Sequence, residues 1–162
     1  MCVPIPKPLD RCEEPVWRDL ARFFVVAPRL LDDDLQRAAG LSLSEYTVLM
    51  NLSEAENSRL RITELASRAY LSGSRMTRLV DELAADGFVE KSRSAGDGRG
   101  MDVTLTQRGM DRLVEAYPTH LASVRRRIID HIDRASLREF GQAIAAVVQS
   151  FEDENEPRGR RS

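Results

Sequence analysis

Residues 62–105 read ITELASRAYLSGSRMTRLVDELAADGFVEKSRSAGDGRGMDVTL, and this stretch decides the fold. Apolar side chains in its first half recur at helical steps, which predicts a short helix followed by a longer one. They are Leu65, Ala66 and Ala69, then Met76, Leu79, Val80 and Leu83. We expect the Thr63 hydroxyl to cap the first helix and Asp86-Gly87 to end the second. The pattern is typical of a helix-turn-helix.

The start of the second helix presents a polar face, and its first carboxylate is Asp81. The face consists of Ser72, Ser74, Arg75, Thr77 and Arg78. A helix start also offers free amides and a positive dipole end to phosphates. In a DNA-reading helix-turn-helix these first turns meet base edges in the major groove, so we expect Arg75 and Arg78 to contact bases or nearby phosphates. The plainer interpretation is a solvated helix face.

Alternating apolar and polar residues then predict a β-hairpin with strands at 88–93 and 101–105. The connecting loop contains three glycines, which allow it to approach another molecule closely. We expect Arg99, at the loop tip, to insert its guanidinium into a minor groove. Arg93 completes the expected DNA-contacting set, and Asp97 is expected to hold the loop by pairing with an arginine.

Four short motifs carry a resemblance to a known family. They are Thr63-Glu64-Leu65-Ala66, Thr77-Arg78-Leu79-Val80-Asp81, Asp97-Gly98-Arg99 and Leu105-Thr106-Gln107-Arg108-Gly109. In this order and spacing, roughly residues 15–152 resemble the MarR-type winged helix-turn-helix regulators. The resemblance implies a homodimer joined by its N- and C-terminal helices, with two recognition helices in successive major grooves. It also implies a repressor that a small phenolic or aromatic molecule releases from DNA.

Composition narrows the function classes. The chain has 162 residues and a formal net charge of −2, so any DNA binding must depend on a few placed side chains. No apolar run approaches the roughly 20 residues of a membrane span, and the N-terminus lacks the apolar core of a signal peptide, so we expect a cytoplasmic protein. No P-loop, Gly-x-Ser-x-Gly or zinc motif is present, so we expect no enzyme activity, no metal and no cofactor.

The expected fold is mostly α-helical with a small β-wing, in five segments. These are a flexible arm at 1–13, N-terminal dimerisation and supporting helices at 14–55, the winged helix-turn-helix core at 56–105, C-terminal dimerisation helices at 106–152 and a disordered tail at 153–162. A core of about 50 residues cannot cover the long amphipathic helices beside it, so their apolar faces need a partner, most economically a second copy. Such a dimer would prefer a near-palindromic site.

Local signals refine the N-terminal half. We expect a helix from near Pro15 to Gly40, kinked or broken at Pro28, with the acidic run 32–34 on a solvated face. The next helix has two overlapping starts, one capped by Ser42 and one by Ser44.

Further signals concern the strands and the C-terminal half. Residues 60–62 could add a third strand to the hairpin. Thr106 is expected to cap a helix that reaches about Asp133 and bends at Pro118, before a final amphipathic helix.

Three functional questions stay open at this point. Four side chains could line an effector cavity, although aromatic residues at helical spacing are usually core: Trp17, Tyr46, Tyr117 and His120. A redox-sensing alternative rests on Cys12, because some MarR-type regulators sense peroxides through a cysteine near the first helix. Acidic neighbours disfavour a reactive thiolate there. The third alternative is a winged-helix protein-interaction module without DNA binding.

Overall fold

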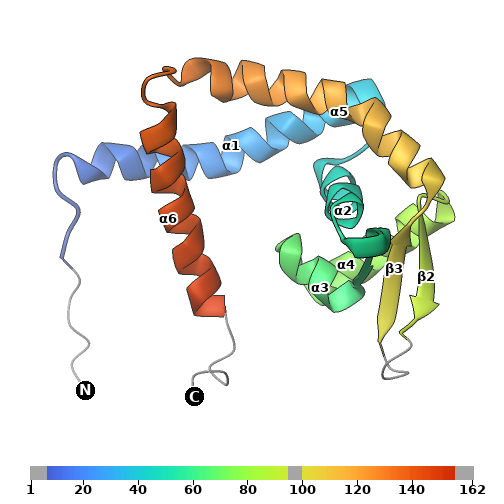
Figure 1. Ribbon diagram of the computed structural model, residues 1–162. Helices are drawn as coiled ribbons and strands as arrows, with labels where there is room; N and C mark the ends of the chain where they lie inside the picture. Colours follow the sequence, from blue (N-terminus) through green and yellow to red (C-terminus); the bar gives the residue numbers. More distant parts are fainter. Residues whose placement is uncertain (1–6, 95–99, 156–162) are drawn as a thin grey trace, which may run out of the picture. The chain divides into compact units, whose positions relative to one another are not determined.

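A computed structural model describes residues 7–94 and 100–155 of the chain, with backbone only at 152–155. It confirms a mostly helical fold with a small antiparallel sheet (Figure 1). The elements are α1 Glu13–Ala39, α2 Leu43–Ser53, β1 Arg59–Arg61, α3 Ile62–Arg68, α4 Gly73–Ala85, β2 Val89–Arg93, β3 Met101–Leu105, α5 Gln107–Arg127 and α6 Leu137–Asn155, with single 3-10 turns at Glu56–Ser58 and Ile129–His131. The chain forms two compact units, Met1–Ser123 and Val124–Ser162.

The sheet has the strand order β1-β3-β2, with both pairings antiparallel. Across the hairpin, Val89 pairs with Leu105 and Arg93 with Met101. The Ser94 amide donates to the Gly100 carbonyl at 2.9 Å and closes the hairpin at the base of its loop. The third strand, predicted at residues 60–62, lies one residue earlier, at Arg59–Arg61. It ends there because Ile62 already begins α3.

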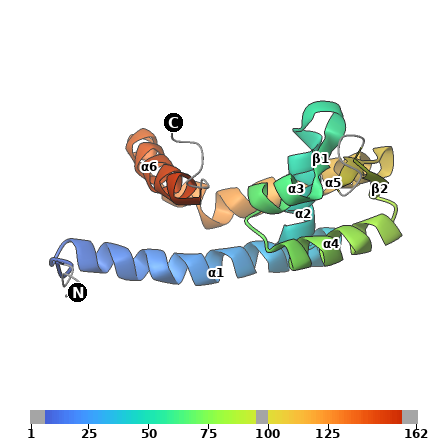
Figure 2. The ribbon, with the colours of Figure 1, turned by 90° about the horizontal axis from the view of Figure 1, so that it is seen from below.

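The core of the first unit lies where α2, α3 and α4 meet the sheet (Figures 1 and 2). Its largest fully buried side chains are Leu35, Leu41, Leu49, Leu52, Leu65, Met76, Leu83, Val48, Val80 and Val103. All four members of the predicted α4 stripe are buried. Because that stripe faces inward, the opposite side of α4 faces solvent.

The long helix α1 continues through Pro28, so the predicted break is wrong. A proline removes one amide donor and frees the carbonyl four residues earlier, here that of Phe24. The side chains around that carbonyl are well exposed, including Phe24 and Val25, so water can bond it in place of the missing amide. α5 is likewise continuous through Pro118.

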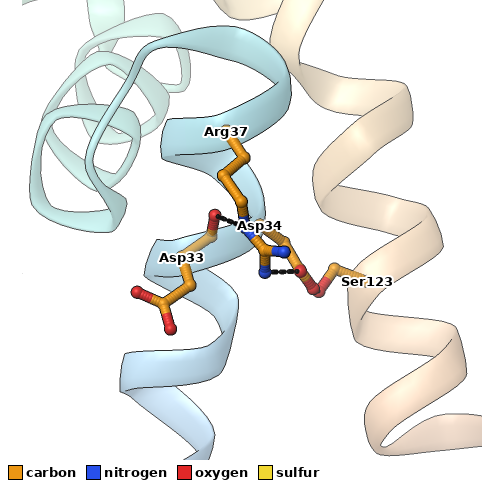
Figure 3. Close-up of polar contacts among 4 residues, drawn as sticks. All are labelled: Asp33, Asp34, Arg37 and Ser123. Carbon is orange, nitrogen blue, oxygen red and sulfur yellow. Dashed lines mark hydrogen bonds and ion pairs between the residues drawn. The ribbon is translucent and has the colours of Figure 1, made fainter.

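The acidic run in α1 is not the solvated face that its charge suggested. Asp32 accepts a hydrogen bond from the Leu43 amide at 2.7 Å, and Asp34 accepts one from the hydroxyl of Ser123 on α5. Arg37 also pairs with Asp34, at 3.0 Å (Figure 3). Two of the three carboxylates therefore connect α1 to its neighbours, and only the Asp33 side chain is exposed.

Two of the three helix starts with a predicted side-chain cap follow the prediction. At α2 the capping box is formed by Ser42 and Glu45, which settles the choice between the two overlapping starts. The Thr106 hydroxyl accepts a hydrogen bond from the Gly109 amide at 3.0 Å and so caps α5. The cap of α4 is Ser72, which was predicted as a DNA contact and not as a cap. Thr63 does not cap α3, because β1 leads directly into the helix and Arg61 occupies the cap position.

The C-terminal boundaries differ from the predictions. α5 ends at Arg127 instead of near Asp133, since Ile128 leaves the helical conformation with φ −132° and ψ −68°. α6 extends to Asn155, past residue 152 where we expected the last helix to end. Among the described residues, no helix combines the length and the apolar character that a membrane crossing requires.

Candidate nucleic-acid interface

The exposed start of α4 is the candidate reading face. Its first turn contains no acidic residue, and all five polar side chains predicted to contact DNA are exposed there. The Ser72 hydroxyl accepts a hydrogen bond from the Arg75 backbone amide at 3.4 Å. It also lies 3.4 Å from the Ser74 hydroxyl. Because positive charge and helix-start amides coincide on one open surface, this face suits phosphates and base edges.

The side chains on this face differ in what they contact. The Arg75 guanidinium donates to the Ser44 hydroxyl of α2 at 3.3 Å. Arg78 lies 3.9 Å from Glu82 in a solvent-exposed ion pair, which holds it only weakly. The Thr77 hydroxyl donates to the Gly73 carbonyl of its own helix at 2.9 Å, so its proton is already used. Both arginines therefore keep N–H donors for a ligand, although Ser44 holds one donor of Arg75 while the Arg78 side chain is freer.

The hairpin lies beside this helix and is tied to it. Lys91 of β2 pairs with Asp81 of α4 at 2.5 Å. Arg93, at the end of β2, is exposed. The predicted contacts of Arg99 and Asp97 lie outside the described residues. The Lys91–Asp81 ion pair therefore joins the hairpin to the reading helix two residues before Arg93.

Asp102 organises the base of the hairpin, and sequence reasoning missed it. Its carboxylate accepts hydrogen bonds from the Ser94 hydroxyl and from Arg59 of β1. The Ser94 bond, with a smaller contribution from Arg59, holds the pKa of Asp102 below its ordinary value. The strand pattern marks Asp102 only as an alternating polar residue, so no local signal reveals that partners eight and 43 residues away converge on it.

The four residues predicted to line an effector cavity do not all come together. Tyr46 of α2 and His120 of α5 stack with ring centroids 4.4 Å apart at an interplanar angle of 29°. Burial raises the pKa of Tyr46, with a further contribution from nearby Tyr117. Trp17, by contrast, is 55% exposed on α1, where Cys12 is also exposed at the cap. The structure thus brings two of the four into contact, with Tyr117 near Tyr46 but 52% exposed.

His120 is the unusual member of this group. Its Nδ1 is buried and has no hydrogen-bond partner among the described residues. Burial lowers the pKa of His120 because the charged imidazolium would lose its hydration. The described residues contain no group of three His, Cys, Asp or Glu side chains that could hold a metal ion.

Replacing His120 with glutamine is expected to flatten the pH dependence of stability in mild acid. Because the folded pKa lies below the unfolded value of about 6.5, unfolded chains take up the proton first as the pH falls. The His120 contribution is therefore complete above that pH and is lost as the pH falls through the folded pKa. Urea unfolding between about pH 5 and 7.5 measures the slope. An unchanged slope in His120→Gln would contradict the expectation.

Comparison with known proteins gives a consistent family signal. Residues 39–100 match the model of the MarR family. The chain is 38% identical over 85 residues to the HTH-type transcriptional repressor YetL of Bacillus subtilis (strain 168). These 85 residues cover 52% of this chain and 51% of YetL. The chain thus spans about half the length of the curated relatives it matches.

Two solved structures are similar over most of their length. One is Sco3205, a MarR family transcriptional regulator from Streptomyces coelicolor in complex with DNA, with a TM-score of 0.84 and 29% identity over 97% of this chain and 96% of that one. The other is AbsC, a MarR family transcriptional regulator from the same organism, with a TM-score of 0.82 and 29% identity over 91% of this chain and 99% of that one.

Proposed function

On the premise that this chain belongs to the MarR family of transcriptional regulators through residues 39–100, we propose that it binds double-stranded DNA sequence-specifically. The observation that carries the proposal is the open, acid-free first turn of α4, with Arg75 and Arg78 exposed on it. The likeness to Sco3205, whose structure contains DNA, supports the same reading. Regulation by DNA binding accounts for these features, and we assign no catalytic role.

We propose further that the protein acts as a homodimer on a near-palindromic site. The support is the large apolar surface that single helices leave exposed. On α1 this surface comprises Val16, Trp17, Phe23, Phe24, Val25 and Val26, and on α6 it comprises Phe140, Ile144, Val147, Val148 and Phe151. Exposed apolar patches of this kind mark interaction sites in soluble proteins, and a second copy would present matching ones.

Repression relieved by an effector is the finer part of the proposal. Tyr46 of α2 stacks on His120 of α5, and the exposed Tyr117 phenol lies near Tyr46, an arrangement that suits a small aromatic or phenolic molecule. A redox signal through Cys12 and a purely protein-binding winged helix stay as alternatives. The exposed thiol of Cys12 at the start of α1 is the observation that favours the first of them.

The test is fluorescence anisotropy with a labelled duplex from the region upstream of the gene. We expect tight binding that weakens steeply as salt rises, because a basic face releases counterions from phosphates. A scrambled duplex should bind more weakly, and aromatic acids or phenols added to the complex should release it. Equal affinity for both duplexes, or no binding at low salt, would favour the protein-interaction alternative.

A further inference from the structure

The first turn of α2 contacts the first turn of α4. Nη2 of Arg75 donates a hydrogen bond to the Ser44 hydroxyl at 3.3 Å, across 31 residues of sequence. A guanidinium carries five N–H donors, so this bond leaves others for a second partner. Because the arginine side chain has many rotamers, a bond to a fixed acceptor narrows the directions in which those donors can point.

Ser44 is a fixed acceptor because the start of α2 is held from two sides. At the start of the helix, the Ser42 hydroxyl accepts a hydrogen bond from the Glu45 amide at 3.1 Å. In return, the Glu45 carboxylate accepts a hydrogen bond from the Ser42 amide at 2.6 Å. From α1, Asp32 accepts the Leu43 amide at 2.7 Å. Since these contacts flank Ser44, its position is set by α1 as well as by its own helix.

The same region forms a cleft of about 260 Å³ that holds arginines and carboxylates together. Its lining includes Asp32, Ser44, Arg75, Arg78 and Glu82. An ion pair with either of these carboxylates would neutralise the Arg75 guanidinium. A serine hydroxyl can hold the same guanidinium without neutralising its charge.

We propose that Ser44 is a positioning residue for Arg75. Its neutral hydroxyl holds the guanidinium in one position without forming an ion pair, so that the charge stays available to DNA. The inference rests on the proposed function, because Arg75 is among the residues assigned to DNA contact. The same contacts connect α1 to the reading face through Asp32 and the start of α2. A shift of α1 could thus reach Arg75 without any change within α4.

A double-mutant cycle tests whether Ser44 acts through Arg75. The probe is a duplex enriched from a random-sequence pool by the 162-residue chain. Ser44→Ala is expected to weaken binding by about three- to tenfold in the wild-type background, as a positioning bond would, and to add nothing in an Arg75→Ala background. Ser53→Ala is the matched control, because its hydroxyl donates to the Met50 carbonyl within α2 and should not affect affinity.

Two further variants separate positioning from folding. Ser44→Thr keeps a hydroxyl and should bind within about twofold of wild type. Ser44→Asp places a carboxylate in the first turn of α2, where the helix dipole favours it and the Asp32 and Glu82 carboxylates of the same cleft oppose it, so its Tm should stay near that of wild type. The same carboxylate would pair with Arg75, so DNA affinity should fall at least as far as in Ser44→Ala. A stable protein with weakened binding is not what a merely structural role predicts.

The outcomes distinguish this inference from the proposed function. Wild-type affinity in both Ser44→Ala and Ser44→Asp would overturn the inference alone. An equal loss from Ser44→Ala with and without Arg75 would also overturn it, because Ser44 would then contact DNA directly. If the unaltered chain enriches no duplex, the proposed function fails, and the inference fails with it.

Discussion

Replacing Gly109 with alanine is expected to lower the free energy of unfolding by about 3 kcal/mol, at the upper end of typical overpacking costs. A Cβ on Gly109 would lie 2.1 Å from the Phe88 carbonyl oxygen and 2.7 Å from a methyl of Leu105. The carbonyl cannot move aside easily, because it accepts a hydrogen bond from the Thr106 amide at 3.0 Å. It also lies 3.0 Å from the Thr106 hydroxyl, whose single proton is shared between this carbonyl and that of Gly87 at 2.8 Å. The clash therefore falls on backbone that joins the hairpin to α5. Urea unfolding at fixed protein concentration measures the change.

Gly73→Ala is the matched control. It lies in the first turn of α4, and a Cβ there would meet nothing within 4 Å. Alanine is the better helix former, so this variant should match or slightly exceed wild-type stability. If Gly109→Ala proved as stable as Gly73→Ala, the close approach of α5 to the Phe88 carbonyl would be wrong.

Replacing Arg78 with alanine is expected to weaken binding to the specific duplex by about 1 to 3 kcal/mol, or roughly 5- to 150-fold. The Arg78 side chain is 79% exposed, and its ion pair with Glu82 spans 3.9 Å, so little holds it away from a ligand. For the same reason its loss should leave the unfolding midpoint nearly unchanged. Anisotropy titrations at two salt concentrations measure the loss, and thermal unfolding checks the fold.

Arg18→Ala removes the same charge from a different surface. Arg18 is 74% exposed on α1 and pairs with Glu14 at 2.6 Å. If Arg78 acts through its place on the reading face, Arg18→Ala should retain affinity near that of wild type. Equal losses in the two variants would mean that only net charge matters, and would remove Arg78 from the proposed interface.

Features that depend only on residues close together in the sequence could be predicted. The α4 stripe follows from residues spaced three and four apart, and its burial sends the polar face outward without further information. The hairpin follows from alternation, and the glutamate three residues after Ser42 marks it as one of the two possible caps of α2. In each case the partners lie within one element or in neighbouring ones, so local chemistry determines the outcome.

Features that depend on distant partners were not predictable. Asp34 looked solvated because it lies in a charge run, yet its partner Ser123 is 89 residues away. Asp102 and Ser44 also have partners on other elements. Asp102 accepts hydrogen bonds from Arg59 of β1 and from Ser94 at the base of the hairpin, and Ser44 accepts one from Arg75 of α4. A single sequence gives no signal for such pairs before the fold brings them together.

The length of α1 turns a small rotation at its C-terminal end into a large displacement at the other end. At 1.5 Å per residue its 27 residues span about 40 Å. The helix ends at Gly40, in a left-handed conformation with φ 59°, and Arg112 of α5 donates to the last carbonyl, that of Ala39. A tilt of about 2° at this end moves the far end by roughly 1.5 Å, the rise of one residue. A contact that fixes the position of the N-terminal end of α1 would therefore fix the orientation of the unit that contains this helix, Met1–Ser123, to within a few degrees.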